Sequence, residues 1–237
     1  MINLESKIGA AHFEMIISFM FFLSFVLFLF AVLTPYTSSP ISVTALDRLQ
    51  IELFNTNKVN YSKFYIKEDQ TTGCFIINLN DNSFDYSFTN SIVKNINEVV
   101  INSELSSSGS LEIDDPGNDM DYFVSFSPEF NSGVVDNPSC VVSAINVVGS
   151  INEREVLSYK RLNDTKTSYK NDYKKLKDDL KVPTIFDFEI VIEEYPELSM
   201  TSRLIPDAAH VSAKNYLMEV LEEDGTLTNA RFTIKVW

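Results

Sequence analysis

Few side chains in this chain of 237 residues are of the types that carry catalytic chemistry. Only two histidines occur, His12 and His210, and they are far apart in the sequence. A histidine-based metal cluster or a serine–histidine–aspartate triad would have to use His210 alone. No short motif of hydrolases, metalloproteases or P-loop proteins is present, and 7 glycines make a phosphate-binding loop improbable. We therefore expect no enzymatic activity and no cofactor.

The two cysteines, Cys74 and Cys140, both lie in segments with strand-like patterns. Their spacing is unlike the C-x-x-C pairs of redox and metal sites. Two cysteines allow a single pairing, and a disulfide between them would close a long loop. In the chain-entropy model this closure stabilises the fold by about 4 kcal/mol. The alternative interpretation is a pair of buried thiols.

Acidic and amide side chains crowd the segment between Asp114 and Asp121. Oxygen ligands at this density can hold Ca²⁺, but the spacing does not match an EF-hand loop. Acidic loop tips are commonly just solvated, so we assign no metal ligands. Elsewhere, the triplets Asn60-Tyr61-Ser62 and Asn163-Asp164-Thr165 make Asn60 and Asn163 candidates for N-glycosylation.

The composition excludes two broad classes of protein. Lys and Arg number 19 against 33 Asp and Glu, for a formal net charge of −14, so a general nucleic-acid binder is not expected. The hydrophobic share of 45% is too high for an intrinsically disordered chain. This share is unevenly distributed, because residues 15–33 are apolar except for Ser18 and Ser24.

The apolar run has the length of a membrane span. A helix over residues 15–33 would be about 28 Å long, close to the ~30 Å of a bilayer's hydrocarbon core. The run ends Ala31-Val32-Leu33-Thr34-Pro35 without the small-residue site of a secretory signal peptide. We therefore expect residues 10–35 to form a transmembrane helix in contact with membrane lipid. Positively charged Lys7 favours a cytoplasmic N-terminus and a C-terminal body outside, at the cell surface.

The residues before the apolar run point to a family. Lys7-Ile8-Gly9 is followed by Ala10 and then by Glu14, next to the apolar helix. This pattern resembles the class III signal peptide of archaeal type IV pilin-like proteins. The resemblance implies that a prepilin peptidase removes residues 1–9 by cutting between Gly9 and Ala10. It also implies that Glu14, then the fifth residue, pairs with the N-terminal amine of a neighbouring subunit.

The resemblance covers residues 7–33 and implies assembly with other pilin-like subunits. The helix would pack in the core of a type IV pilus-like filament, and residues 36–237 would form a head that is displayed outside. An uncleaved, single-pass anchored envelope or receptor module explains the same residues. Such a module would bind an extracellular ligand or partner and would not polymerise.

Periodicity predicts the elements of the body. Leu46, Leu49 and Leu53 recur on one face of a predicted helix over residues 41–54. After residue 58 the period changes to two, which is typical of strands. We expect a hairpin of strands around 59–65 and 74–79, an exposed loop or a hairpin tip over 103–121, and further strands over 83–88, 99–101, 122–126, 141–148 and 155–159.

One long helix, a strand and a hairpin complete the body. The helix is predicted to begin at Asn163 or Ser168 and to end at Lys181, and the strand covers 185–193. Asp224-Gly225 is a strong turn signal for a closing hairpin of 216–222 and 226–236. The predicted fold class is α+β: an N-terminal transmembrane helix, then a β-rich, mostly antiparallel extracellular head with one principal amphipathic helix.

Overall fold

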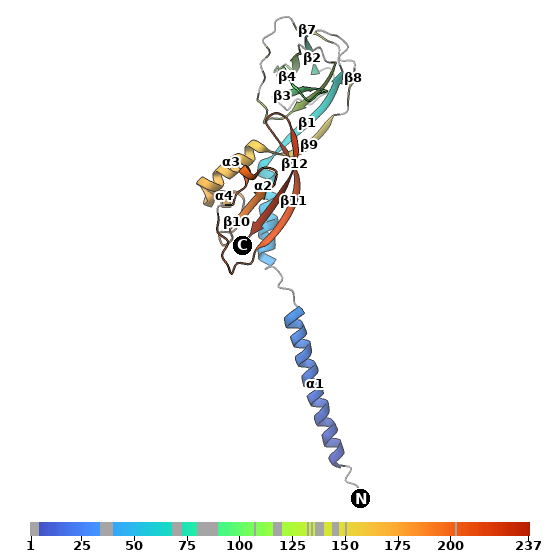
Figure 1. Cartoon of the computed structure of the whole chain (residues 1–237), viewed down its shortest axis with the longest axis vertical. Coiled ribbons are helices and arrows are strands. Elements are labelled where there is room, and N and C mark those ends of the chain that lie inside the picture. The colour runs from blue at the N-terminus through green and yellow to red at the C-terminus, as the bar shows by residue number, and fades with distance from the viewer. Residues whose placement is uncertain are drawn as a thin grey trace. The chain divides into compact units, whose positions relative to one another are not determined.

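The fold is described from a computed structural model of the chain, shown in Figure 1. The structure describes residues 5–33, 40–67, 73–79, 90–106, 108–115, 120–131, 133, 135, 140–143, 147–149, 151–201 and 203–237. The chain divides into two compact units, Met1–Ile41 and Ser42–Trp237. We call the second unit the head.

The first unit contains helix α1 (Glu5–Leu33). In the part of the chain that the structure describes, no helix combines the length and the apolar character that crossing a membrane requires. The predicted transmembrane helix was therefore wrong, and so was the single-pass localisation with an external head that depended on it. The side chains of α1 are described for residues 14–30. That stretch would be about 26 Å long, shorter than the ~30 Å of a hydrocarbon core.

The head is built on one large sheet. Its described strands form a 12-stranded sheet in the order β10-β12-β11-β9-β1-β6-β3-β4-β5-β2-β7, with β8 paired to β1. The strands are β1 (Lys58–Lys67), β2 (Cys74–Asn78), β3 (Ser91–Asn95), β4 (Val100–Leu105), β5 (Ser110–Asp114), β6 (Asp121–Phe126), β7 (Val141–Val142), β8 (Val147–Val148), β9 (Asn152–Ser158), β10 (Phe188–Ile192), β11 (Ser212–Leu221) and β12 (Leu227–Val236).

The sheet is mixed. Strand β9 runs parallel to β11, and β2 runs parallel to β7, while the other pairs are antiparallel. The described part of the head contains three α-helices: α2 (Pro40–Asn57), α3 (Tyr159–Asn171) and α4 (Tyr173–Asp179). A short 3₁₀ helix covers Pro196–Leu198. The predicted fold class, with a spanning helix and one principal amphipathic helix, was therefore wrong.

Two predicted helices have different outcomes. The leucine stripe of 41–54 does form a helix, α2, because Leu46, Leu49 and Leu53 all bury their side chains in the core. The single helix predicted to end at Lys181 is two helices, α3 and α4. The break falls at Asp172, whose side chain accepts a hydrogen bond from the Lys175 backbone N and so caps α4.

The closing hairpin is confirmed, whereas the first predicted hairpin was wrong. Strands β11 and β12 pair antiparallel from Leu221 opposite Leu227 to Ser212 opposite Val236. Strand β1, in contrast, pairs with β6 and β9, and β2 pairs with β5 and β7. Neighbours in the sequence therefore separate into different parts of the sheet at this point.

Three further predictions concern the middle of the chain. Of the two alternatives for 103–121, the exposed loop was wrong and the hairpin was correct, because the segment holds the end of β4 and all of β5, and these two strands pair antiparallel. The expected buried strand over 141–148 was also wrong, because β7 and β8 have two residues each and Val142 is 71% exposed. The strand predicted over 83–88 lies outside the described residues.

Three groups of buried apolar side chains form the core of the head. The largest lies between α2, α3, α4 and strands β10 to β12, which Figure 1 shows together at one end of the head, and it includes Leu157 from the end of β9. The second lies among β1 to β6 at the other end. The third is small and contains Val59, Tyr61, Phe130, Val156 and Leu221. Each half of the sheet thus has its own core, and the small cluster lies where β1 and β9 join them.

The α2 stripe should be essential for the stability of the head. Replacing the fully buried Leu49 by alanine leaves a cavity against the sheet. We expect Leu49→Ala to lower the free energy of unfolding by about 2–5 kcal/mol, measured by urea denaturation. Leu204→Ala is the matched control, because Leu204 is 94% exposed and its loss should change stability by less than about 0.5 kcal/mol. Equal effects of the two substitutions would contradict this packing of α2.

Candidate functional site

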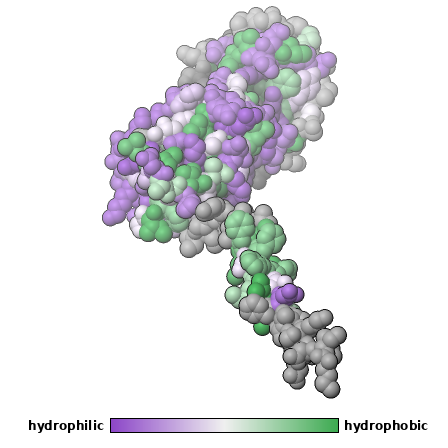
Figure 2. All heavy atoms as spheres, turned by 60° about the horizontal axis from the view of Figure 1, so that its bottom comes forward, coloured by the Kyte–Doolittle hydropathy of each residue, from purple (hydrophilic) through white to green (hydrophobic). Residues whose placement is uncertain are grey.

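The described surface of α1 is almost entirely apolar. Large hydrophobic side chains are exposed along its whole described length, and Figure 2 shows them as a predominantly green column. Monomeric soluble proteins rarely expose contiguous apolar patches of this extent, so such surfaces indicate interaction sites. The exposed residues are Met15, Ile16, Ile17, Phe19, Met20, Phe21, Phe22, Leu23, Phe25, Leu27, Phe28 and Phe30.

The apolar surface of α1 faces every direction around the helix. Phe19, Met20, Phe21 and Phe22 are consecutive, and each is at least 62% exposed. Because successive helical residues are about 100° apart, four in a row cover a full turn. An amphipathic helix would instead confine its apolar residues to one stripe. No single face of α1 is therefore distinguished as the contact surface.

The residues that suggested pilin-like processing all lie in α1. Gly9 and Ala10 fall inside the helix, which begins before them at Glu5. Glu14 is exposed and is the one ionisable residue among 14–30. The structure thus brings a single carboxylate to the edge of the described apolar surface.

A second candidate site is a pocket in the head with a volume of about 370 Å³. Its floor is one face of four adjacent strands, β9, β1, β6 and β3. The register places Lys63 opposite Ser125, and it places Lys94 opposite Phe123. Arg154 lies opposite Tyr61 at the β9 side. Residues distant in the sequence therefore share one surface because β6 pairs with both β1 and β3.

The turn between β11 and β12 closes the pocket from the other side. Gly225 in this turn has φ +80°, a conformation that favours glycine. Asp224 accepts hydrogen bonds from the backbone N of Thr226 at 2.8 Å and from its hydroxyl at 2.9 Å. Burial alone would raise the pKa of Asp224, but these bonds and the charge of Lys94 outweigh it and lower the pKa. Thr226 is thereby held in a fixed position at the rim.

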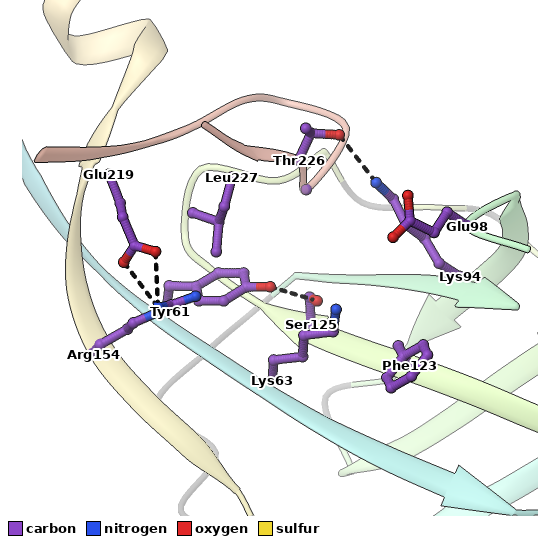
Figure 3. Close-up of a pocket in the computed structure, with 11 residues that line it drawn as sticks. Tyr61, Lys63, Lys94, Glu98, Phe123, Ser125, Arg154, Glu219, Thr226 and Leu227 are labelled. Carbon is purple, nitrogen blue, oxygen red and sulfur yellow. Dashed lines mark hydrogen bonds and ion pairs between the residues drawn. The ribbon is translucent and has the colours of Figure 1, made fainter. Parts of the chain in front are cut away.

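Polar contacts organise the rest of the lining, as Figure 3 shows. Arg154 forms an ion pair with Glu219 at 2.9 Å. Lys94 donates to the hydroxyl of Thr226 at 3.2 Å. The hydroxyl groups of Tyr61 and Ser125 are 3.1 Å apart and share a hydrogen bond, and burial raises the pKa of Tyr61. The ammonium of Lys63 lies 4.5 Å from the centroid of the Phe123 ring.

The structure joins Cys74 and Cys140 in a disulfide, with their Cα atoms 4.6 Å apart. Cys74 is the first residue of β2, and Cys140 directly precedes β7. The parallel pairing of Phe75 with Val141 places the two cysteines side by side. The bond therefore attaches the short edge strand β7 to the sheet.

Both candidate glycosylation residues are exposed, but their surroundings differ. Asn60 lies within β1, opposite Glu155 of β9. Asn163 lies in α3, and Thr165 of the same triplet is buried and donates a hydrogen bond to Asn57 at 2.8 Å. The side chain of Thr165 thus already has a structural role in the folded head.

His210 and the described residues of the acidic segment do not line the pocket. His210 is exposed in the segment before β11. Asp115 is buried and accepts a hydrogen bond from the Tyr122 hydroxyl at 2.9 Å, and Asp121 accepts one from the Tyr65 hydroxyl. Residues 116–119 lie outside the described residues. Among the described residues, no group of three or more His, Cys, Asp or Glu side chains could hold a metal ion.

Sequence patterns did not reveal the pocket. Its lysines, Lys63 and Lys94, interrupt strands that otherwise carry apolar residues at alternate positions, and this is a weak signal. Only the pairing of both strands with β6 shows that the two positions share a face. The contribution of the distant β11–β12 turn could not be seen in any local pattern.

Comparison with known proteins identifies no relative. No family model matches the chain, and neither a curated protein nor a solved structure matches it.

The disulfide generates a stability prediction. Reduction should lower the free energy of unfolding by about 4 kcal/mol, because the unfolded chain loses a closed loop with a sequence separation of 66. Urea denaturation with and without a reductant measures this difference. A Cys74→Ser/Cys140→Ser double variant is the control, since its stability should not respond to the reductant. An equal response of both proteins would show that the bond does not stabilise the head.

Proposed function

We propose that this chain is a structural subunit that assembles with further copies of itself through α1, in the manner of a type IV pilin-like filament. The role is assembly rather than catalysis. One observation carries the proposal: the described part of α1 exposes large apolar side chains on all sides. The resemblance of residues 7–33 to a class III signal peptide and its helix supports the same interpretation.

Leaving the apolar side chains of α1 in water costs free energy. Each fully buried Phe, Leu, Ile or Met side chain contributes about 1.5–3 kcal/mol relative to exposure. Twelve such side chains are exposed on α1, which provides a large driving force for association. Even after the entropic cost of ordering subunits, estimated at about 4–15 kcal/mol, burial of most of this surface favours assembly.

The distribution of the apolar residues argues for several neighbours rather than one. A partner that binds through a single groove covers one face of a helix and leaves the opposite face in water. Phe19, Met20, Phe21 and Phe22 point in four directions, so all are covered only when helices surround α1. A further copy of the chain supplies an equally long helix with the same surface, and a filament core provides neighbours on every side.

In such an assembly, Glu14 would set the position of each subunit along its neighbour. A lone carboxylate among packed apolar helices is costly, whereas a carboxylate paired with a cation is compensated. In the proposed assembly, a peptidase of the prepilin type cuts between Gly9 and Ala10. The new amine of Ala10 in one subunit then pairs with Glu14 of a neighbour.

The assembly should depend on the apolar surface of α1. We expect the full chain to form large oligomers and Phe21→Lys to shift it toward monomers, because a lysine cannot be buried without a partner. Sedimentation velocity in matched buffers measures the change. Leu204→Lys is the control, since Leu204 is an exposed leucine of the head and its replacement should leave assembly unchanged. A wild-type monomer, or equal assembly of Phe21→Lys and wild type, would contradict the proposal.

Processing is tested separately on the protein isolated from its own cells. Mass spectrometry of the mature chain should find Ala10 as the first residue. The Glu5 and Lys7 charges leave together with the leader, so the formal net charge of the mature chain is unchanged. Retention of Met1 to Gly9 would contradict the prepilin-type cleavage.

A further inference from the structure

The pocket of the head has an excess of positive charge, although the chain as a whole is strongly acidic. Three cationic side chains and two carboxylates line it. The carboxylate of Glu219 is paired with Arg154, so these two charges compensate each other. Lys63, Lys94 and Glu98 remain, which leaves one net positive charge among the residues that line the pocket. Asp224, whose pKa the charge of Lys94 lowers, lies outside this lining and bonds Thr226 at the rim. In a chain of formal net charge −14, a lining with a positive balance is unusual.

The two lysines keep their capacity to bind an anion. Among the described residues, neither Lys63 nor Lys94 forms an ion pair with a carboxylate. Lys94 donates one hydrogen bond, to Thr226, and an ammonium group has three hydrogens to donate. The ammonium of Lys63 lies over the Phe123 ring. This contact leaves the N–H groups of the ammonium available to donate hydrogen bonds to oxygen atoms. Charge-assisted hydrogen bonds from such groups are the strong ones.

Apolar surface lies beside the two ammonium groups. Phe123 is partly exposed and lines the floor of the pocket together with Lys63 and Lys94, as Figure 3 shows. Leu227 lies at the turn on the opposite side and is also partly exposed. The volume of about 370 Å³ falls within the ~300–1,000 Å³ of ligand pockets, which combine apolar walls with a few placed polar groups.

We propose that this pocket binds a small organic monocarboxylate, with its acid group between Lys63 and Lys94 and its apolar part against Phe123 and Leu227. The single net positive charge of the lining matches one carboxylate. The hydroxyl groups of Ser125 and Thr226 line the same pocket and complete its polar side. This binding site is independent of α1, so it does not rest on the proposed assembly.

The test uses the full chain and three small probe molecules. Benzoate carries both a carboxylate and an apolar ring, benzyl alcohol has the ring without the charge, and inorganic phosphate has the charge without the ring. We expect saturable binding of benzoate by isothermal titration calorimetry, at least about tenfold tighter than either control probe. Absence of saturable benzoate binding would overturn the proposal. Equal binding of benzyl alcohol or of phosphate would also overturn it.

Two variants locate the binding. Lys63→Met and Lys94→Met should each weaken benzoate binding by about tenfold or more, the effect of losing one charge-assisted hydrogen bond. Lys58→Met is the matched control, because Lys58 lies on the same strand, outside the pocket, in an ion pair with Glu155 at 2.9 Å. Circular dichroism checks that every variant folds. Unchanged affinity in both folded pocket variants, or an equal loss in Lys58→Met, would show that the acid group does not bind there.

Discussion

The register of β1 between β6 and β9 is the constraint on which the head depends. Both edges of this strand are paired, so Lys63 lies between Ser125 on one side and Asn152 on the other. Alternate residues of the strand face different surroundings. Phe64 and Ile66 point into the core of β1 to β6, and Tyr61 and Lys63 belong to the opposite face with the small core and the pocket. A shift of one residue would exchange these faces. It would bury a lysine among aromatic rings, so the core and the pocket depend on the same pairing.

The two units differ in how far their apolar side chains are buried. The head has buried cores of its own, with Leu49, Phe188 and Phe232 among the fully buried side chains. Helix α1 has no such core among its described residues, since most of its apolar side chains are exposed and none is buried. In the assembly that we propose, the burial of apolar surface that folds the head would act on α1 through association. Substitutions in α1 and substitutions in the head core should for this reason have separable effects.

Elements whose signal is local were predictable from the sequence. The stripe of Leu46, Leu49 and Leu53 specifies a helix because its period matches the helical turn, and α2 buries these residues. Asp224-Gly225 specifies a hairpin turn because few residues adopt a positive φ, and Gly225 does so. The split between α3 and α4 was missed, although the capping side chain of Asp172 marks it. The short exposed β7 was mistaken for part of a buried strand, because Val141 and Val142 are β-branched wherever they lie.

By itself, the sequence determined the positions of strongly periodic elements, the apolar character of α1 and the scarcity of catalytic residues. Only the tertiary structure decided which strands pair, that the sheet is mixed, and that Lys63, Lys94 and Thr226 line one pocket. The reason is physical. Periodicity and turn residues act over a few positions, whereas strand pairing depends on the sum of distant contacts over whole faces. Lys94 and Thr226 are joined by a hydrogen bond across 132 positions of the chain, and no local pattern encodes a contact of that range.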